Sequence, residues 1–503
     1  EKIYSVIDQL AEAYVDEGEI TCVVMAEGDK IEMEEKLRDK LVHQDRVKLV
    51  VRSGSAVSLD DLSRVAIDEA RAAIVLIDET AVENPTRADG RVIKTLLATF
   101  NHPDVKKNGR HVPVTCEVML AESQEIARIA SNGRAEVVKT NEIISKVILQ
   151  TARIPGLSLV YDELLRFEGN EIHFKRFDGV AGKRFGDLLL DFPNACVVGV
   201  ATKGAGHTLN PPAEYVLGAE EELLVLAEDS NIAHKPYAGS QRLEAVPPPP
   251  AAEKPVEHLL ILGWNEKIFP ILQEYDNYVG EGSTLTLVNQ VPEAERLAMI
   301  ATQLPGLQTK LRHIIGDFTS RQLMDEIQPE RYPTVMVLGD SPDGTAEGAD
   351  TRAIIALLLL RDRRQKNQVA SQEVCSEILD PKNRELAATT EIDDIVISNE
   401  MVSMVLAQIT YEPRVRAVLE DLFQSDGSEI YLKDIALYTA PGATTTFEQM
   451  ILAAKARGEV ALGIQLRALG GEKHGLLLNP AERTKPIVPQ PGDRLVVLAE
   501  EDG

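Results

Sequence analysis

The second half of this chain repeats the first half, and this duplication limits the fold more than any other feature of the sequence. Six pairs of similar segments occur in the same order in both halves, with partners roughly 260 to 270 residues apart. The pairs are Glu1–Tyr4 with Glu266–Phe269, Val75–Asp78 with Val337–Asp340, Ala88–Arg91 with Ala349–Arg352, Gly169–Ile172 with Gly427–Ile430, Leu209–Pro211 with Leu478–Pro480, and Val225–Glu228 with Val497–Glu500. Loop insertions and deletions produce such small changes in spacing, so we expect two copies of one module.

Each copy begins with short apolar runs that alternate with helical patterns, which is typical of βαβ units around a parallel sheet. In the first copy we expect these strands near residues 20–26, 47–51, 72–77 and 112–117. After about residue 154 the pattern changes to short strands with turns, near 171–175, 195–201 and 222–227. The predicted fold class is α/β, with two tandem Rossmann-like, doubly wound parallel-sheet lobes, each followed by a small α+β C-terminal lobe.

The predicted domain boundaries follow this pattern. The first Rossmann-like lobe covers 1–153 and its C-terminal lobe covers 154–232, and the second copy divides into 257–411 and 412–503. Residues 233–256 form the predicted linker between the copies. Within it, the proline-rich run Val246–Ala252 predicts a stiff, extended spacer, because proline fixes φ and cannot join a sheet ladder.

An apolar run at the start of the second copy, His258–Asn265, has no counterpart in the first copy. The run predicts a buried strand that enters a glycine turn, and in a doubly wound sheet this first strand is central. We therefore expect the first lobe to have its first strand missing, which leaves two neighbouring strands with unpaired ladders. Because the chain also begins with Glu rather than Met, we expect the natural protein to continue upstream with such a strand and turn.

Charge and composition exclude several classes of protein. Lys and Arg number 53 against 80 Asp and Glu, and the resulting net charge of −27 repels nucleic acid. No stretch approaches the roughly 18 to 20 apolar residues of a membrane helix. The four cysteines form no CxxC pair and the histidines form no HExxH motif, so we expect reduced, buried thiols rather than a zinc site or a disulfide framework.

Catalytic motifs are missing from the sequence as well. It contains no GxSxG elbow and no P-loop, so we do not expect an enzyme. A dinucleotide site would need G-x-G-x-x-G after the first strand, so that backbone amides can approach a pyrophosphate. The second copy has Gly263-Trp264-Asn265 instead, with Asn289 where an acidic residue would hold the ribose. NAD is therefore disfavoured in the second copy, whereas nucleotide binding stays open in the first.

Ligands of open parallel sheets gather at the carboxyl ends of the strands, beside the topological switch point. In the first copy, the predicted ligand-binding residues at these ends are Glu27, Asp29, Arg52, Ser53, Asp78 and Glu79. In the second copy they are Gly263, Asn265, Asp317 and Asp340. Ca²⁺ takes about six to eight oxygen ligands, so we predict a Ca²⁺ site on the carboxylates Glu27, Asp29, Asp78 and Glu79. Two other interpretations stay open, in which these carboxylates cap the following helices or pair with Arg52.

Two sets of stretches carry a resemblance to known proteins. Gly316–Thr319, Ser376–Asn383 and Pro491–Leu498 are similar to stretches that recur in regulator-of-conductance (RCK, or TrkA-N plus TrkA-C) domains. The second set resembles the CASTOR/POLLUX ion channels and comprises Arg52–Ser55, Asp61–Leu62, Ala70–Leu76, Pro155–Leu157, Phe192–Ala195 and Leu223–Asp229. This resemblance covers essentially the whole chain and is specific in its order.

The resemblance implies a cytoplasmic gating apparatus. In that family a pore-forming membrane domain precedes the first RCK domain in the same polypeptide, and a homotetramer places eight RCK domains in a ring below a cation pore. The chain would then be the soluble, ligand-sensing part of a K⁺ or Ca²⁺-regulated channel on the cytoplasmic side of a membrane. We expect the helices Asn141–Arg153 and Asn399–Tyr411 to couple its lobes.

Two alternatives to a channel region stay open. An NAD(P)-dependent oxidoreductase would share the Rossmann pattern, although a fold alone does not carry a function. A separately encoded peripheral subunit of a potassium transporter, like TrkA, would share the RCK resemblance.

Overall fold

The computed structural model describes residues 2–77, 84–108, 111–204, 206–239, 254–342, 344–369, 371–392, 394–440, 442–470 and 474–500. The chain forms two compact units. The first, here called the Rossmann unit, joins Glu1–Leu149, His258–Asp276 and Thr284–Arg416. The second, here called the C-terminal unit, joins Gln150–Glu257, Asn277–Ser283 and Ala417–Gly503. Each unit thus contains the same lobe from both copies. The predicted spacer Val246–Ala252 lies outside the described residues.

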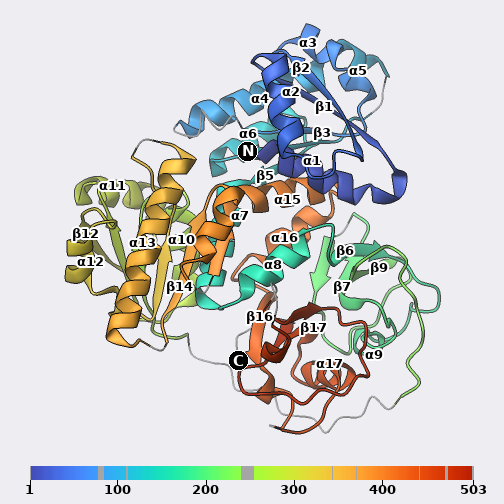
Figure 1. Ribbon diagram of the computed structural model, residues 1–503. Helices are drawn as coiled ribbons and strands as arrows, with labels where there is room; N and C mark the ends of the chain where they lie inside the picture. Colours follow the sequence, from blue (N-terminus) through green and yellow to red (C-terminus); the bar gives the residue numbers. More distant parts are fainter. Residues whose placement is uncertain are drawn as a thin grey trace. The chain divides into compact units, whose positions relative to one another are not determined.

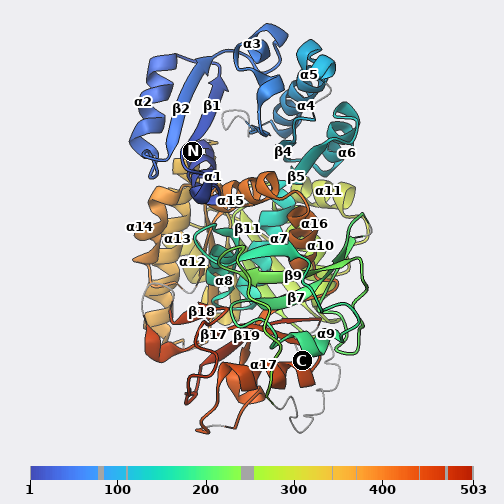
Figure 2. The same cartoon turned by 90° about the vertical axis from the view of Figure 1, so that its right-hand side faces the viewer.

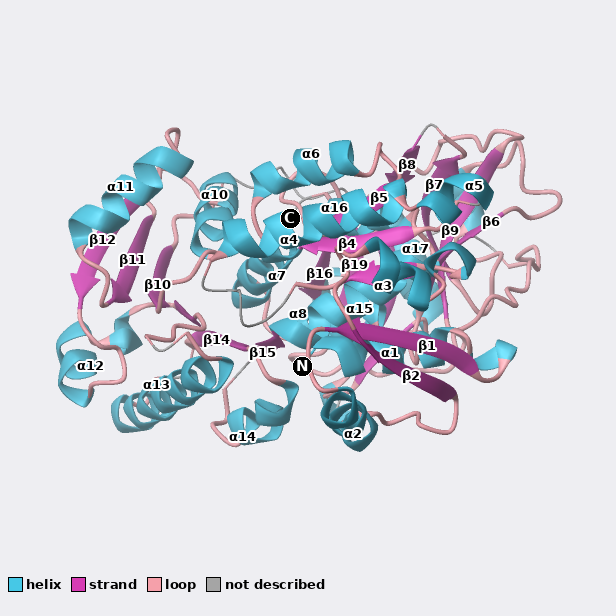
Figure 3. Cartoon of the chain, turned by 90° about the horizontal axis from the view of Figure 1, so that it is seen from above, coloured by secondary structure: helices cyan, strands magenta, loops and turns pink. Residues whose placement is uncertain are grey.

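The second copy supplies a complete doubly wound lobe to the Rossmann unit. Its six parallel strands lie in the order β12-β11-β10-β13-β14-β15, the order of a dinucleotide-binding fold with β10 at the centre. Helices α10 and α11 cover one face of the sheet and α12, α13 and α14 cover the other, so the central strands are buried on both sides (Figure 3). The bounds are β10 His258–Leu262, α10 Ile268–Tyr278, β11 Thr284–Asn289, α11 Glu293–Gln303, β12 Lys310–Ile315, α12 Arg321–Ile327, β13 Thr334–Val337, α13 Ala346–Asn367, β14 Glu373–Ile378, α14 Arg384–Ala388, β15 Asp394–Ile397 and α15 Ser398–Tyr411.

The first copy supplies a lobe whose strands form two separate sheets. Strand β1 pairs with β2, and β3, β4 and β5 form the other sheet, so the described residues place no strand between β1 and β3. Figure 2 shows β1 and β2 apart from β4 and β5. The buried apolar side chains on these two sheets likewise form separate clusters. The bounds are α1 Lys2–Ala13, β1 Ile20–Ala26, α2 Lys30–Lys40, β2 Val47–Ser53, α3 Leu59–Arg64, β3 Ala73–Val75, α4 Pro85–Asn101, α5 Pro103–Asn108, β4 Val114–Val118, α6 Ala121–Ala130, β5 Ala135–Lys139 and α7 Thr140–Arg153.

The final helix of each Rossmann lobe packs against the other copy. On α7 of the first copy, the Ser145 hydroxyl donates to the carbonyl oxygen of Lys267 at 2.9 Å, just before α10 of the second copy. On α15 of the second copy, the Ser403 hydroxyl donates to the carbonyl oxygen of Lys2 at 3.2 Å, at the start of α1. The Rossmann unit is therefore held together by a reciprocal exchange of helices.

The two C-terminal lobes share one antiparallel topology. The first has the strand order β6-β9-β7-β8 and the second β16-β19-β17-β18. Figure 1 shows β6, β7 and β9 of the first lobe in green and β16 and β17 of the second in orange to red. Both central pairs shift register at the same place, between Val197 and Gly199 and between Ala461 and Gly463. The bounds are α8 Leu157–Leu165, β6 Glu171–Lys175, α9 Phe185–Leu188, β7 Cys196–Thr202, β8 Gly206–Leu209 and β9 Glu221–Ala227 in the first lobe, and α16 Val415–Leu422, β16 Glu429–Asp434, α17 Phe447–Ala456, β17 Val460–Gln465, β18 Leu476–Leu478 and β19 Arg494–Ala499 in the second.

The repeated Leu-Asn-Pro motif joins these two lobes. Asn210 and Asn479 both adopt left-handed backbone, with φ of +42° and +44°. The side-chain amide of Asn210 donates to the carbonyl oxygen of Gly458 at 2.8 Å, and that of Asn479 donates to the carbonyl oxygen of Asn194 at 2.9 Å. Each asparagine therefore binds the turn before the central strand of the opposite copy.

The predicted fold class is confirmed, and each expected strand of the first copy overlaps an observed one. All four cysteines are free thiols, as expected, and Cys116, Cys196 and Cys375 are buried. The expected burial is wrong for Cys22, which is only partly buried on β1. Burial raises the pKa of Cys116 to about 12.

Candidate functional site

Glu27 and Asp29 follow β1, and both already have partners. The Glu27 carboxylate accepts a hydrogen bond from the Ser55 hydroxyl at 2.8 Å and lies 2.5 Å from the guanidinium of Arg91 on α4. The Asp29 carboxylate accepts from the backbone amides of Ile31 and Glu32 at 2.9 and 3.0 Å, so it caps the N-terminus of α2. The structure thus favours an ion pair for Glu27 and helix capping for Asp29.

Arg52 and Ser53 end the neighbouring strand β2. The Ser53 hydroxyl donates to the carbonyl oxygen of Gly28 at 2.7 Å, which ties the end of β2 to the turn after β1. The Arg52 guanidinium donates to the carbonyl oxygen of Val51 at 3.1 Å. Asp78 and Glu79 lie outside the described residues. The predicted Ca²⁺ site therefore has two described members, and it stays a prediction.

The glycine turn after β10 is closed by side chains of the lobe itself. Gly263 has a φ of +106°, and a Cβ there would lie 2.5 Å from the carbonyl oxygen of Leu338, so other residues do not fit. The Asn265 side-chain amide donates to the carbonyl oxygen of Gly339 at 2.7 Å and to Glu377 at 3.2 Å. A dinucleotide would need bare backbone amides at this turn, and it meets the side chains of Trp264 and Asn265 instead.

Asp317 and Asp340 meet at one arginine. The Arg352 guanidinium on α13 lies 3.1 Å from Asp317 and 3.9 Å from Asp340, and it sits over the Phe318 ring at 4.6 Å. Burial acts to raise the pKa of Asp317, but hydrogen bonds from Thr319 and the charge of Arg352 hold it below its ordinary value. Burial raises the pKa of Asp340 despite Arg352. The strand ends of the second copy therefore hold a charged cluster in which Arg352 acts as the cation.

The sequence did not single out Arg91 and Arg352 as site residues, although both lie in the matched repeat segments Ala88–Arg91 and Ala349–Arg352. Each arginine reaches an acidic residue at a strand end of its own copy. Two residues earlier in each segment, Asp89 accepts from the backbone amides of Met119 and Leu120, and Asp350 does the same for the turn after β14. Only the repeat marked these four positions in the sequence. Their roles could not be predicted, because the residues that they contact lie about 30 positions away or more.

A buried lysine and glutamate pair also occurs in each Rossmann lobe. Lys2 lies 2.9 Å from Glu117, and Lys267 lies 2.8 Å from Glu377, and neither carboxylate is exposed. Burial alone would raise the pKa of Glu377, but Lys267, Ser398 and the Gly339 amide hold it below its ordinary value. These pairs tie the start of a first helix to a sheet strand, and we assign them a structural role.

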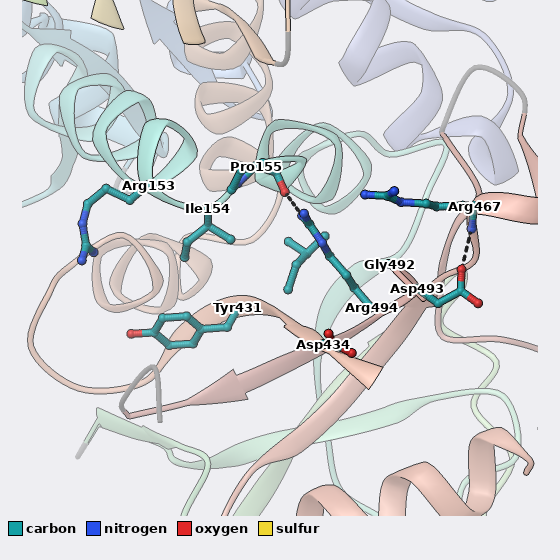
Figure 4. A pocket seen from close by; sticks show the side chains of 10 residues that line it. Arg153, Ile154, Pro155, Tyr431, Asp434, Arg467, Gly492, Asp493 and Arg494 are labelled. Carbon is teal, nitrogen blue, oxygen red and sulfur yellow. Dashed lines mark hydrogen bonds between the residues drawn. The ribbon is translucent and has the colours of Figure 1, made fainter. Parts of the chain in front are cut away.

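The C-terminal unit contains a polar cavity of about 310 Å³, here called the arginine cavity. Its walls come from the turn between α7 and α8, from β16, from the turn at Arg467 after β17, and from the start of β19 with the loop before it (Figure 4). The lining residues are Arg153, Ile154, Pro155, Tyr431, Leu432, Asp434, Arg467, Gly492, Asp493 and Arg494. None of them was a predicted ligand residue, because the cavity combines segments more than 270 residues apart.

Comparison with known proteins extends over the whole chain. Residues 141–242 match the family model described as Castor and Pollux, part of voltage-gated ion channel, and residues 1–119 match the model of the calcium-activated potassium channel slowpoke-like RCK domain. The chain is 30% identical over 521 residues to the probable ion channel POLLUX of Oryza sativa subsp. japonica, and the match covers 96% of this chain and 52% of that protein. The chain is similar to the CASTOR/POLLUX ion channels throughout its length.

A second relative agrees with this result. The ion channel POLLUX of Lotus japonicus is 30% identical over 537 residues, covering 100% of this chain and 57% of that protein. The chain therefore spans a little over half the length of the POLLUX relatives that it matches, and the expected resemblance to CASTOR/POLLUX is confirmed.

A solved structure supports the fold. The human SLO3 gating ring superimposes with a TM-score of 0.66 at 15% identity, covering 97% of this chain and 96% of that one. At this identity the likeness establishes the shared fold of two Rossmann-like lobes and two C-terminal lobes. In the described part of the chain, no helix has both the length and the apolar character needed to cross a membrane.

Proposed function

We propose that this chain is the ligand-sensing gating region of a cation channel, either K⁺-conducting or Ca²⁺-regulated, with a regulatory rather than a catalytic role. The observation that carries the proposal is the similarity to CASTOR/POLLUX ion channels along the whole chain. The fold shared with the SLO3 gating ring supports the same role. A pore-forming membrane domain would belong to the same polypeptide, with this chain on the cytoplasmic side.

Gating of this kind needs differential binding and no chemical step. Moving a two-state gate from 1:99 to 99:1 takes about 5.5 kcal/mol, or roughly 1.4 kcal/mol per subunit if four subunits act together. One or two extra contacts to a ligand in each subunit supply that energy. The exchanged helices α7 and α15 support the proposal, because a shift in one Rossmann lobe acts directly on the helix that packs against it from the other copy.

Exposed apolar side chains in equivalent positions of the two Rossmann lobes support assembly into a homotetrameric ring with eight RCK-type domains. On the first lobe, Leu97 of α4 and Ile126 of α6 are 45% and 51% exposed. Their counterparts on the second lobe, Leu358 of α13 and Leu386 of α14, are 41% and 55% exposed. We propose that these surfaces bind other copies of the chain, since apolar patches of this kind mark interaction sites.

Recording from the full-length protein tests the channel role. Reconstituted in planar bilayers, it should carry a cation current whose open probability changes when this chain is removed by limited proteolysis. No cation current, or a current that is indifferent to removal of the chain, would contradict the proposal. Light scattering tests the assembly. The double variant Ile126→Glu and Leu386→Glu should have a lower oligomer mass than the parent chain, whereas the control Ile31→Glu, at an exposed site on α2, should keep the parent mass.

A further inference from the structure

The arginine cavity has an unequal supply of donors and acceptors. Its two carboxylates already accept hydrogen bonds from backbone amides. The nearly fully buried Asp493 accepts from the amides of Arg467 and Gln490 at 2.9 and 2.8 Å, and Asp434 accepts from the amide of Ala436 at 2.9 Å. These acids are therefore used in shaping the loops that form the wall.

Two of the three arginines keep donors available inside the cavity. The Arg494 guanidinium donates to the carbonyl oxygen of Pro155 at 2.5 Å, which uses one of its five N–H groups. The Arg467 side chain runs toward Arg494 (Figure 4) and packs against Gly492, where an added Cβ would lie 2.8 Å from the guanidinium carbon. Within the described residues, neither Arg467 nor Arg494 has a carboxylate at ion-pair distance.

Arg153 has a different role from the other two. Its guanidinium points away from Arg467 and Arg494 (Figure 4), lies 2.9 Å from Glu257, and stacks over the Tyr278 ring at 4.1 Å. Its charge is therefore already compensated by Glu257, whereas Arg467 and Arg494 are the cavity arginines that have no ion-pair partner among the described residues.

The first C-terminal lobe does not repeat this charge arrangement. In the second lobe, Asp434 of β16 pairs across the ladder with Arg494 of β19. The corresponding positions of the first lobe, one residue beyond the Lys175 and Leu223 pair, are Arg176 and Glu222. The acidic Glu222 thus stands where the second lobe has Arg494, so the feature belongs to the second copy and not to the shared fold.

We propose that the arginine cavity binds a small phosphate-bearing molecule between Arg467 and Arg494. Two planar guanidinium groups that approach one point match the several oxygens of a phosphate, whereas one such group satisfies a carboxylate. The volume of about 310 Å³ lies at the lower end of the range for small-molecule pockets, about 300 to 1,000 Å³. The polar lining disfavours an apolar ligand. This proposal needs no pore and stands apart from the channel role.

Calorimetric titration of the whole 503-residue chain tests the proposal, with inorganic phosphate and AMP as probes in chloride buffer of constant ionic strength. At least one probe should bind, and Arg467→Gln and Arg494→Gln should each weaken that binding at least tenfold, with partial recovery in Arg494→Lys. The matched control is Arg176→Gln, an exposed arginine that lies 3.1 Å from Glu220 and should change binding less than twofold.

The two probes distinguish the sources of the phosphate. Equal affinity for both identifies the free ion as the ligand, and tighter binding of AMP identifies a nucleotide. Arg494→Gln also loses the hydrogen bond to Pro155, so this variant can lower the stability of the fold. Arg467 is exposed, and the thermal unfolding of Arg467→Gln should therefore match that of the parent chain. Failure of both probes to bind the parent chain, or unchanged binding in the variant that carries both Arg467→Gln and Arg494→Gln, would overturn the proposal.

Discussion

The ammonium group of Lys267 lies 2.8 Å from a carboxylate oxygen of the fully buried Glu377. Removing one partner of a buried pair leaves the other charge without compensation, which costs about 3 to 5 kcal/mol. We expect Lys267→Met to lower the free energy of unfolding by about this amount in urea denaturation. The control is Lys36→Met, whose partner Glu32 is exposed on α2, and it should cost under about 0.5 kcal/mol. Equal losses in the two variants would show that the buried pair has no special role.

Asn210 and Asn479 join the C-terminal lobes and have positive φ. Substitutions there can separate two contributions to stability, the strain of the backbone and the hydrogen bonds of the side chain. Asn479 donates to the Asn194 carbonyl oxygen and accepts from Arg483 at 2.7 Å. We expect Asn479→Ala to cost about 2 to 4 kcal/mol, and Asn479→Gly about 1 kcal/mol less, because glycine adopts positive φ without strain.

The exposed Asn132, with a φ of +53°, is the control for that comparison. Asn132→Ala should show the backbone cost alone, in urea denaturation measured at the same pH. If Asn479→Ala costs no more than Asn132→Ala, the contact between the lobes does not contribute to stability.

Burial raises the pKa of Glu171, at the start of β6, from 4.5 to about 7. A raised pKa means that the folded chain binds the proton more tightly than the unfolded chain, so this contribution to stability is full below pH 4.5 and is lost as the pH rises to about 7. We expect Glu171→Gln to be more stable than the parent by about 1 to 3 kcal/mol at pH 8 and equal to it at pH 4. Thermal or urea unfolding across this range measures the difference.

The exposed Glu122→Gln on α6 is the control for the pH series. The raised pKa of Glu171 would be contradicted if the stability difference between Glu171→Gln and the parent stayed constant from pH 4 to pH 8.

Arg91 competes with any cation for Glu27 at the strand ends of the first copy. If Ca²⁺ binds there, Arg91→Gln should tighten its binding about two- to fivefold, the equivalent of an exposed ion pair, and Glu27→Gln should weaken it. Calorimetry with Ca²⁺ and Mg²⁺ measures both changes. Ca²⁺ binding that is unaffected by either substitution would place the ion elsewhere.

Much of the fold could be predicted because the repeat and the apolar runs are local signals. The run at His258–Leu262 indicated a central strand, and β10 occupies that position. The roles of the matched residues were not predictable in the same way. Lys2 and Glu117 meet across 115 residues, and no period in the sequence marks such a pair.

The candidate ligand residues were predicted less completely than the fold. Strand ends could be located, so Glu27, Asp317 and Asp340 were named, but the arginines that neutralise them come from a later helix. The arginine cavity could not be predicted from the sequence, because Pro155 and Arg494 come together only through the pairing of lobes from both copies.

The division of the first Rossmann lobe into two sheets affects how this lobe unfolds locally. Strand β1 pairs with β2 and strand β3 with β4, whereas β10 pairs with strands on both sides. Small sheets open in separate steps, each at a lower cost than the opening of one continuous sheet. Amide hydrogens of β1 and β3 should therefore exchange with deuterium well before those of β10 and β13. A strand inserted between β1 and β3 would merge the two openings into one cooperative event and slow both.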